Sequence, residues 1–131
     1  MVLAPKFLKA YNKIFKAKRV LLACHMRPDG DALAAMCAMI ELMEYLEKPY
    51  AAYCYDLPPR QYSFLPHIEK ITNRKDAWNF ADFDVVVILD CGQLSRSRLE
   101  NEVMSRAAGQ YVIESDHHPK MQDYADLEIR N

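Results

Sequence analysis

Residues 19–31, with the sequence RVLLACHMRPDGD, contain the features that decide the fold. The run RVLLACH is continuously apolar up to its polar end, as expected of a strand that is covered on both faces of a parallel sheet. Asp29-Gly30-Asp31 then turns the chain, and residues 32–47 are rich in Ala, Leu, Met and Glu, which favour a helix. The segment therefore predicts a buried strand, an acidic turn and a helix.

An amphipathic helix is predicted at residues 6–18. Apolar side chains fall on one helical face and lysines on another; they are Leu8, Tyr11, Ile14 and Phe15, and Lys9, Lys13 and Lys16. The lysine face is interpreted as solvated, with contact to phosphates as the alternative.

Strands and helices go on alternating along the rest of the chain. The expected strands are residues 50–55 (YAAYCY), 84–89 (DVVVIL) and 111–113, and the expected helix is residues 95–108, with Gly109 as its end. Between the second and third strands, Pro58, Pro59 and Pro66 predict a surface segment with one short helical turn. The alternation predicts an α/β fold with a doubly wound, mainly parallel sheet and helices on both faces.

Length and composition bound the class of protein. A chain of 131 residues, 51% hydrophobic, favours one compact domain over residues 1–131. Neither a bilayer-length apolar stretch nor a secretion signal is evident, so a cytoplasmic protein is expected. The four cysteines lack a CxxC pair and are predicted to be buried thiols. Because the formal charge is −1, an anionic substrate must be attracted locally, for example by metal ions.

Polar clusters follow three of the expected strands, at the sheet edge where ligands bind in such folds. They are His25 to Asp31, Asp90, and Asp116 to His118. Taken alone, each cluster is as consistent with a turn, a helix cap or a polar surface segment. Together they place several carboxylates at one edge, where they would repel one another without cations. The combined pattern therefore predicts a metal site.

The residue types indicate how such a site would be used. Carboxylates with imidazoles suit Mn, Mg, Zn or Fe. Asp29 and Asp31 flank a glycine and could serve neighbouring ions, with Asp90 bridging the pair. His117 would add a nitrogen ligand, and His118 would be free to meet a phosphate oxygen. Two ions about 3.5–4 Å apart suit phosphoryl displacement, which predicts hydrolysis of a phosphate ester.

Three motifs resemble those of the DHH phosphoesterase superfamily. They are HMRPDGDAL at residues 25–33, Asp90-Cys91-Gly92 with Arg96, and Asp116-His117-His118-Pro119. The chain is most similar to the branch that degrades short oligoribonucleotides and dephosphorylates 3′-phosphoadenosine 5′-phosphate. The resemblance implies two manganese sites: one held by His25, Asp29 and Asp90, the other by Asp31, Asp90 and His117. It also implies that Asp116 orients a ligand and that His118 contacts the scissile phosphate.

The chain departs from the family pattern in two places, of which the first removes no ligand. Ala34-Ala35 replaces a common Gly-Ser pair, and the sequence ends at Asn131, about where a fourth motif should begin. The family's C-terminal substrate-binding domain is absent, so the chain is interpreted as a fragment or a very short member. An asparagine at or near the ligand position would bind a metal only weakly.

The leading hypothesis is a two-metal phosphoesterase acting on short single-stranded RNA or a small phosphorylated nucleotide. Catalytic roles are expected for Asp90, Asp116 and His118, and phosphate contacts for His118, Arg27 and Arg96, although each arginine is equally plausible as an ion-pair partner. Manganese is favoured over magnesium because magnesium prefers all-oxygen ligands. The alternatives are a pyrophosphate or polyphosphate hydrolase and a non-catalytic metal- and nucleotide-binding module. A membrane partner is not expected, and a homodimer is left open.

Overall fold

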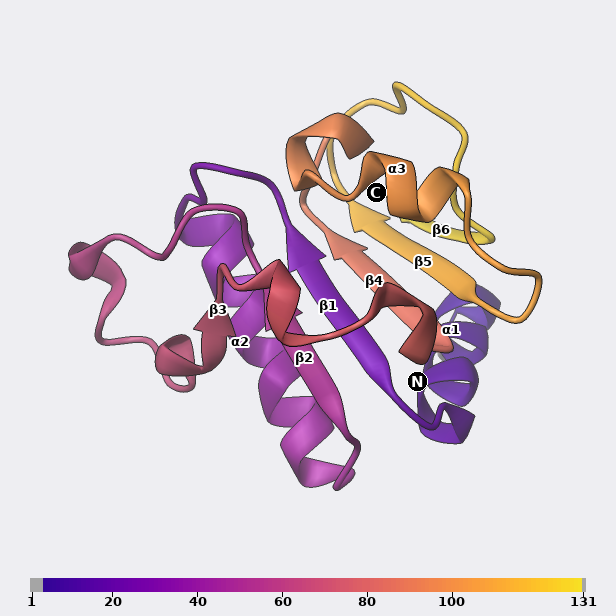
Figure 1. Cartoon of the computed structure of the whole chain (residues 1–131), viewed down its shortest axis with the longest axis horizontal. Coiled ribbons are helices and arrows are strands. Elements are labelled where there is room, and N and C mark those ends of the chain that lie inside the picture. The colour runs from indigo at the N-terminus through magenta and orange to yellow at the C-terminus, as the bar shows by residue number, and fades with distance from the viewer. Residues whose placement is uncertain (1–3, 131) are drawn as a thin grey trace.

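The structure, a computed structural model that describes residues 4–130, contains one six-stranded sheet with helices on both faces (Figure 1). The strands are β1 (Val20–Cys24), β2 (Tyr50–Tyr53), β3 (Ile71–Thr72), β4 (Val85–Leu89), β5 (Tyr111–Asp116) and β6 (Leu127–Arg130). The α-helices are α1 (Pro5–Lys16), α2 (Gly30–Tyr45) and α3 (Glu100–Met104). All strand pairs are parallel, and the order β3-β2-β1-β4-β5-β6 reverses direction between β1 and β4. The predicted doubly wound α/β fold is confirmed, and the reversal is where such sheets bind ligands.

The sheet separates two apolar layers, because successive side chains of a strand point to opposite faces. Leu22 and Cys24 of β1 pack in the layer that contains α2 and the buried side of α1. Leu21 and Ala23 pack in the other layer, with Val103 of α3. Both faces of β1 and β4 are fully buried, which explains their unbroken apolar sequences. All four cysteines are buried thiols, as predicted.

The helix predicted for residues 95–108 is wrong in its extent. A 3-10 turn at Leu94–Ser97 (η5) precedes the short helix α3, and Arg98 between them has a left-handed φ of 61°. The Ser97 hydroxyl donates to the Leu94 carbonyl (2.6 Å) and accepts from the Leu99 amide (3.1 Å). Serine side chains that take over backbone hydrogen bonds in this way compete with helix continuation.

Two strands escaped the sequence analysis, and a third was predicted too short. β3 has only two residues, and β6 is an edge strand in which only Leu127 is buried. The strand predicted at residues 111–113 extends to Asp116, where it pairs with Arg130 of β6. Asp116 therefore belongs to the sheet, whereas the sequence analysis placed it in a following loop.

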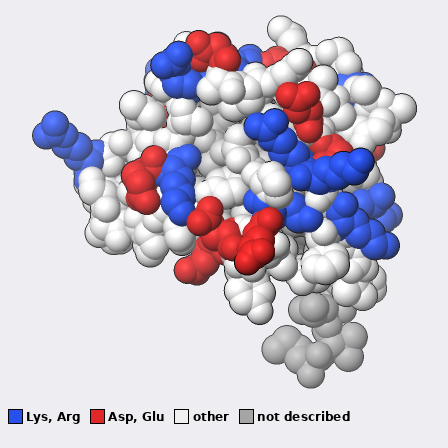
Figure 2. Space-filling model, turned by 60° about the horizontal axis from the view of Figure 1, so that its bottom comes forward, with Lys and Arg blue, Asp and Glu red and all other residues white. Residues whose placement is uncertain are grey.

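The apolar face predicted for α1 is mostly exposed among the described residues. Of its four predicted members only Ile14 is buried, while Leu8, Tyr11 and Phe15 are 49%, 42% and 56% exposed. The helix carries four lysines and no acidic residue, and Figure 2 shows positive side chains gathered on the side of the molecule where α1 lies. Within residues 4–130 no helix is both long and apolar enough to cross a membrane.

The junction between α1 and β1 depends on Asp84, which precedes β4. Its carboxylate accepts hydrogen bonds from the backbone amides of Lys18 (2.9 and 3.1 Å) and Arg19 (2.9 Å). We expect Asp84→Ala to lower the free energy of unfolding by about 1–2 kcal/mol in urea denaturation, because these amides lose their acceptor. The matched control is Asp82→Ala: this exposed carboxylate lies 3.8 Å from Arg19, and its loss should cost under roughly 0.5 kcal/mol. If both substitutions lowered the free energy of unfolding equally, the assigned role of Asp84 at the junction between α1 and β1 would be contradicted.

Candidate metal centre

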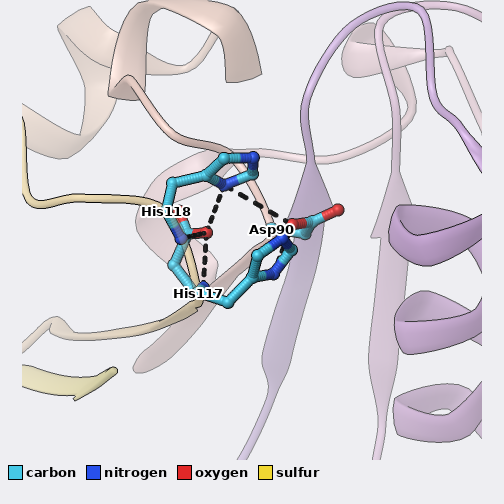
Figure 3. A group of neighbouring side chains, drawn as sticks. Asp90, His117 and His118 are labelled. Carbon is cyan, nitrogen blue, oxygen red and sulfur yellow. Dashed lines mark hydrogen bonds and ion pairs between the residues drawn. The ribbon is translucent and has the colours of Figure 1, made fainter. Parts of the chain in front are cut away.

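Side chains from separate strands converge at the carboxyl edge of the sheet. Asp90 follows β4, and His117 and His118 follow β5. Figure 3 shows both imidazoles beside the Asp90 carboxylate. The Nδ1 atoms of His117 and His118 lie 3.3 and 3.6 Å from Asp90 Oδ1, and the two rings stack with centroids 4.4 Å apart. The structure thus brings together three of the residues predicted for the site.

Asp90 is held in an unfavourable state. Its side chain is 9% exposed, and among the described residues Oδ1 makes no hydrogen bond, although the Nδ1 atoms of His117 and His118 lie 3.3 and 3.6 Å away. Its φ of 50° lies in the left-handed region, which side-chain-bearing residues seldom adopt. Burial raises the pKa of Asp90; His117 and His118 oppose that shift, whereas the charges of Asp29 and Asp116 add to it. A buried carboxylate of this kind calls for a cation.

A second group forms where β1 ends. His25 Nε2 lies 3.6 Å from Asp29 Oδ1, and ligand atoms of His25, Asp29 and Asp90 lie within 4.8 Å of one another. The Nδ1 atom of His25 is 2.6 Å from the Met26 carbonyl. A proton on Nδ1 would be donated to that carbonyl, leaving Nε2 with a free lone pair on the side of Asp29. This geometry suits a metal-binding imidazole.

Asp29 also caps α2. Its Oδ1 accepts the backbone amide of Ala32 (3.0 Å), and this hydrogen bond is the main cause that lowers the pKa of Asp29. The positive end of the helix macrodipole likewise favours a charged carboxylate there. Asp29 is therefore ionised at neutral pH and available as a ligand.

Asp31 is exposed in the first turn of α2 and falls outside the two groups of close ligand atoms. It does line the same pocket as Asp90 and His117, a cavity of about 280 Å³. The remaining wall is made by Phe7, Ala35, Leu89, Ser115, Asp116 and Ile129. The structure thus places Asp31 at the same cavity as its predicted partners, but outside the groups of close ligand atoms.

Asp116 anchors the loop that carries both histidines. Its Oδ1 accepts from the amides of His117 (2.8 Å) and His118 (3.0 Å) and lies 2.5 Å from His118 Nδ1, while Oδ2 accepts from the Gly92 amide (2.7 Å). Burial alone would raise the pKa of Asp116, but the bonds from His118 and Gly92 outweigh it and lower the pKa. Gly92 turns the chain at φ 73°, a conformation that favours glycine. With Nδ1 bound to Asp116, Nε2 is the free nitrogen of His118.

Arg130 and Glu114 support this loop, and sequence reasoning missed both. Glu114 is 1% exposed in the middle of β5. It accepts from the Tyr124 hydroxyl (2.9 Å), and its Oε1 lies 2.7 Å from Arg130 Nη2. Arg130 Nη1 donates to the His118 carbonyl (2.5 Å). The available signal was a glutamate inside an otherwise apolar strand, since a buried charge requires a partner.

The two arginines predicted to contact phosphate lie in different environments. The Nη2 atom of Arg96 lies 3.3 Å from His25 Nδ1, so this guanidinium borders the site. Arg27 is exposed, its backbone amide donates to Asp56 (2.7 Å), and among the described residues its side chain does not line the 280 Å³ pocket. Asn131, the residue expected near a fourth motif, lies outside the described residues.

The donor set fits divalent cations. Two ligands of one ion, each about 2.1 Å from it and at near-right angles, lie roughly 3 Å apart. The contacts His117–Asp90 (3.3 Å) and His25–Asp29 (3.6 Å) are close to that spacing. Asp90 belongs to both groups, so its carboxylate is the one that could join two ions.

Comparison with known proteins identifies the family of the chain. The family model "DHH family, N-terminal domain" matches residues 19–131. The chain therefore belongs to the DHH family, which at family level comprises metal-dependent phosphoesterases.

Individual relatives are distant. The chain is 22% identical over 108 residues to a bifunctional oligoribonuclease and PAP phosphatase of Bacillus subtilis, and 26% identical over 115 residues to a protein of the same description from Mycoplasma genitalium. These matches cover 82% and 88% of the chain but only 32% and 35% of the relatives. The chain thus spans about a third of their length.

A solved structure confirms the fold. The chain superimposes on a crystal structure of an exopolyphosphatase-related protein from Bacteroides fragilis with a TM-score of 0.84 at 21% identity. The match covers 98% of this chain and 39% of that one.

The raised pKa of Asp90 gives a test of its role. A carboxyl whose pKa is higher in the folded state is destabilising once it is ionised, so stability is lost as pH rises through that pKa. We expect Asp90→Asn to raise the melting temperature of the metal-free protein at pH 7 by a few degrees, since the amide is uncharged and tolerates left-handed φ. The same change should weaken Mn²⁺ binding in calorimetry by about tenfold or more.

The matched control is Asp123→Asn, whose carboxylate is 81% exposed. It should alter neither quantity. A destabilised Asp90→Asn variant that still binds Mn²⁺ normally would contradict the assigned role.

Arg130 gives a second test. We expect Arg130→Met to lower the free energy of unfolding by about 3 kcal/mol, because Glu114 is left buried and charged. Mn²⁺ affinity should also fall, by about tenfold, because the His118 carbonyl is released. The double variant Arg130→Met/Glu114→Gln should recover much of the stability but not the affinity. Lys120→Met serves as control, because among the described residues Lys120 forms ion pairs with Asp123 and Glu128 and with no site residue. Unchanged Mn²⁺ affinity in Arg130→Met would show that the loop needs no such support.

Proposed function

We propose that this chain is the metal-binding catalytic domain of a phosphoesterase that hydrolyses short oligoribonucleotides or small phosphorylated nucleotides by a two-metal mechanism. The observation that carries the proposal is the position of Asp90. Among the described residues its buried Oδ1 makes no hydrogen bond, and Asp90 belongs both to the group with His25 and Asp29 and to the group with His117.

The proposed ligands fall into two sets that share Asp90. His25, Asp29 and Asp90 would hold one ion, and Asp31, Asp90 and His117 the other. Manganese is the proposed metal because imidazoles contribute to both sets. Ions held there would supply an activated water and stabilise the charge on the phosphate oxygens.

The chain's own residues would position the reacting groups. Hydrolysis forms a bond from a water oxygen to phosphorus and breaks the bond from phosphorus to the leaving oxygen, which takes up a proton. His118 would contact the phosphate through Nε2, because its Nδ1 is engaged by Asp116. Arg96, beside His25, would bind a further phosphate oxygen.

The proposed substrate class has two supports. Both relatives named above are described as oligoribonucleases and PAP phosphatases. In addition, α1 carries four lysines and no acidic residue, so it is a region of local positive charge in a chain whose net charge is −1. Such a region attracts anionic substrates.

The test is hydrolysis by the full chain of a 5′-phosphorylated ribodinucleotide, of adenosine 3′,5′-bisphosphate and of pyrophosphate, each with Mn²⁺ and with a chelator. We expect metal-dependent cleavage of the first two and a loss of about 100-fold in kcat/KM for Asp90→Asn and for His118→Ala. Asp123→Asn is the control and should keep full activity.

Other outcomes favour the alternatives. Cleavage of pyrophosphate alone would replace the proposed substrate with inorganic phosphoanhydrides. Nucleotide binding with Mn²⁺ but without cleavage of any substrate would identify a binding module.

A further inference from the structure

The lining of the 280 Å³ pocket is chemically mixed. Asp31, Asp90 and His117 are the proposed metal ligands in it. Phe7, Ala35 and Ile129 are apolar lining residues, contributed by α1, α2 and β6. A ligand composed only of phosphates would leave these apolar residues without a complementary group.

Besides the imidazole of His117, Phe7 carries the only aromatic ring among the described residues that line this pocket. It lies in the first turn of α1, where Pro5 begins the helix, and it is 49% exposed. A half-exposed aromatic ring at a pocket wall still has apolar surface that a planar ligand could cover. Two further exposed rings of the same helix, those of Tyr11 and Phe15, stack on each other with centroids 6.0 Å apart.

We propose that Phe7 is a specificity-determining residue that stacks on the base of a nucleotide whose phosphate lies beside the proposed metal ligands of the same pocket. This proposal rests on the proposed function, since it assigns the second half of the same site. Stacking on an aromatic ring tolerates any base, because every base has a π-face. Phe7 would therefore select nucleotides over inorganic phosphoanhydrides without selecting a sequence.

The first measurement compares adenosine 5′-monophosphate with ribose 5-phosphate by calorimetry, using the full chain with saturating Mn²⁺. The two probes share the sugar and phosphate and differ only in the base. We expect the nucleotide to bind about tenfold more tightly. Phe7→Ala should abolish this ratio by weakening the nucleotide alone, and Phe7→Trp should restore it.

Phe15→Ala is the matched control. It removes the same kind of side chain from the same helix at a position 56% exposed and outside the pocket, so the ratio should persist. Phe7→Leu keeps an apolar side chain, which guards against loss of folding, and should still lower the ratio.

Equal affinity for the two probes in the unmodified chain would overturn the proposal, as would a ratio that Phe7→Ala leaves intact. Hydrolysis assays separate this failure from failure of the proposed function. If the chain cleaves phosphate esters with Mn²⁺ but binds adenosine 5′-monophosphate and ribose 5-phosphate equally well, only the stacking role of Phe7 is rejected. Absence of both cleavage and phosphate-dependent binding rejects the proposed function and the role of Phe7 with it.

Discussion

The electrostatic constraint at the carboxyl edge of the sheet governs the rest of the site. Parallel strands bring Asp90 and Asp116 to one edge, and the start of α2 adds Asp29. The three carboxylates have different partners. Asp29 and Asp116 accept hydrogen bonds from backbone amides, whereas among the described residues Asp90 Oδ1 accepts none. A cation bound beside Asp90 would offset its buried negative charge.

The strands and the hydrogen bonds around the site fix the positions of its side chains. The apolar faces of β1 and β4 fix the strand ends from which His25 and Asp90 emerge. Asp116 fixes the histidine loop through backbone amides, and the Glu114–Arg130 pair holds the same loop from β6. The site is therefore stabilised by rigid elements and by hydrogen bonds to its loop, which favours a preformed geometry over one assembled on binding.

The sequence was sufficient to predict the fold class and several of the residues that converge, but among the described residues Asp31 falls outside the close ligand groups and Arg27 outside the pocket. Continuous apolar runs identified β1 and β4, since such runs occur where a strand is covered on both faces. Asp90, His117 and the His25–Asp29 pair were predicted from their positions after strands. Local helix propensity failed at residues 95–108 because a serine side chain replaced helical hydrogen bonds. Three features were not predicted: the edge strand β6, the pairing of Glu114 with Arg130, and the exposure of α1. They depend on tertiary packing, which the periodicity of one segment does not reveal.

The central claim is that Asp90 joins two metal ions. Anomalous diffraction from crystals grown with Mn²⁺, recorded at the manganese absorption edge, tests it most directly. The account predicts two peaks about 3.5–4 Å apart, one beside His25 and Asp29 and the other beside His117, each within bonding distance of Asp90. A single peak that does not touch Asp90, or no peak in well-ordered crystals, would contradict it.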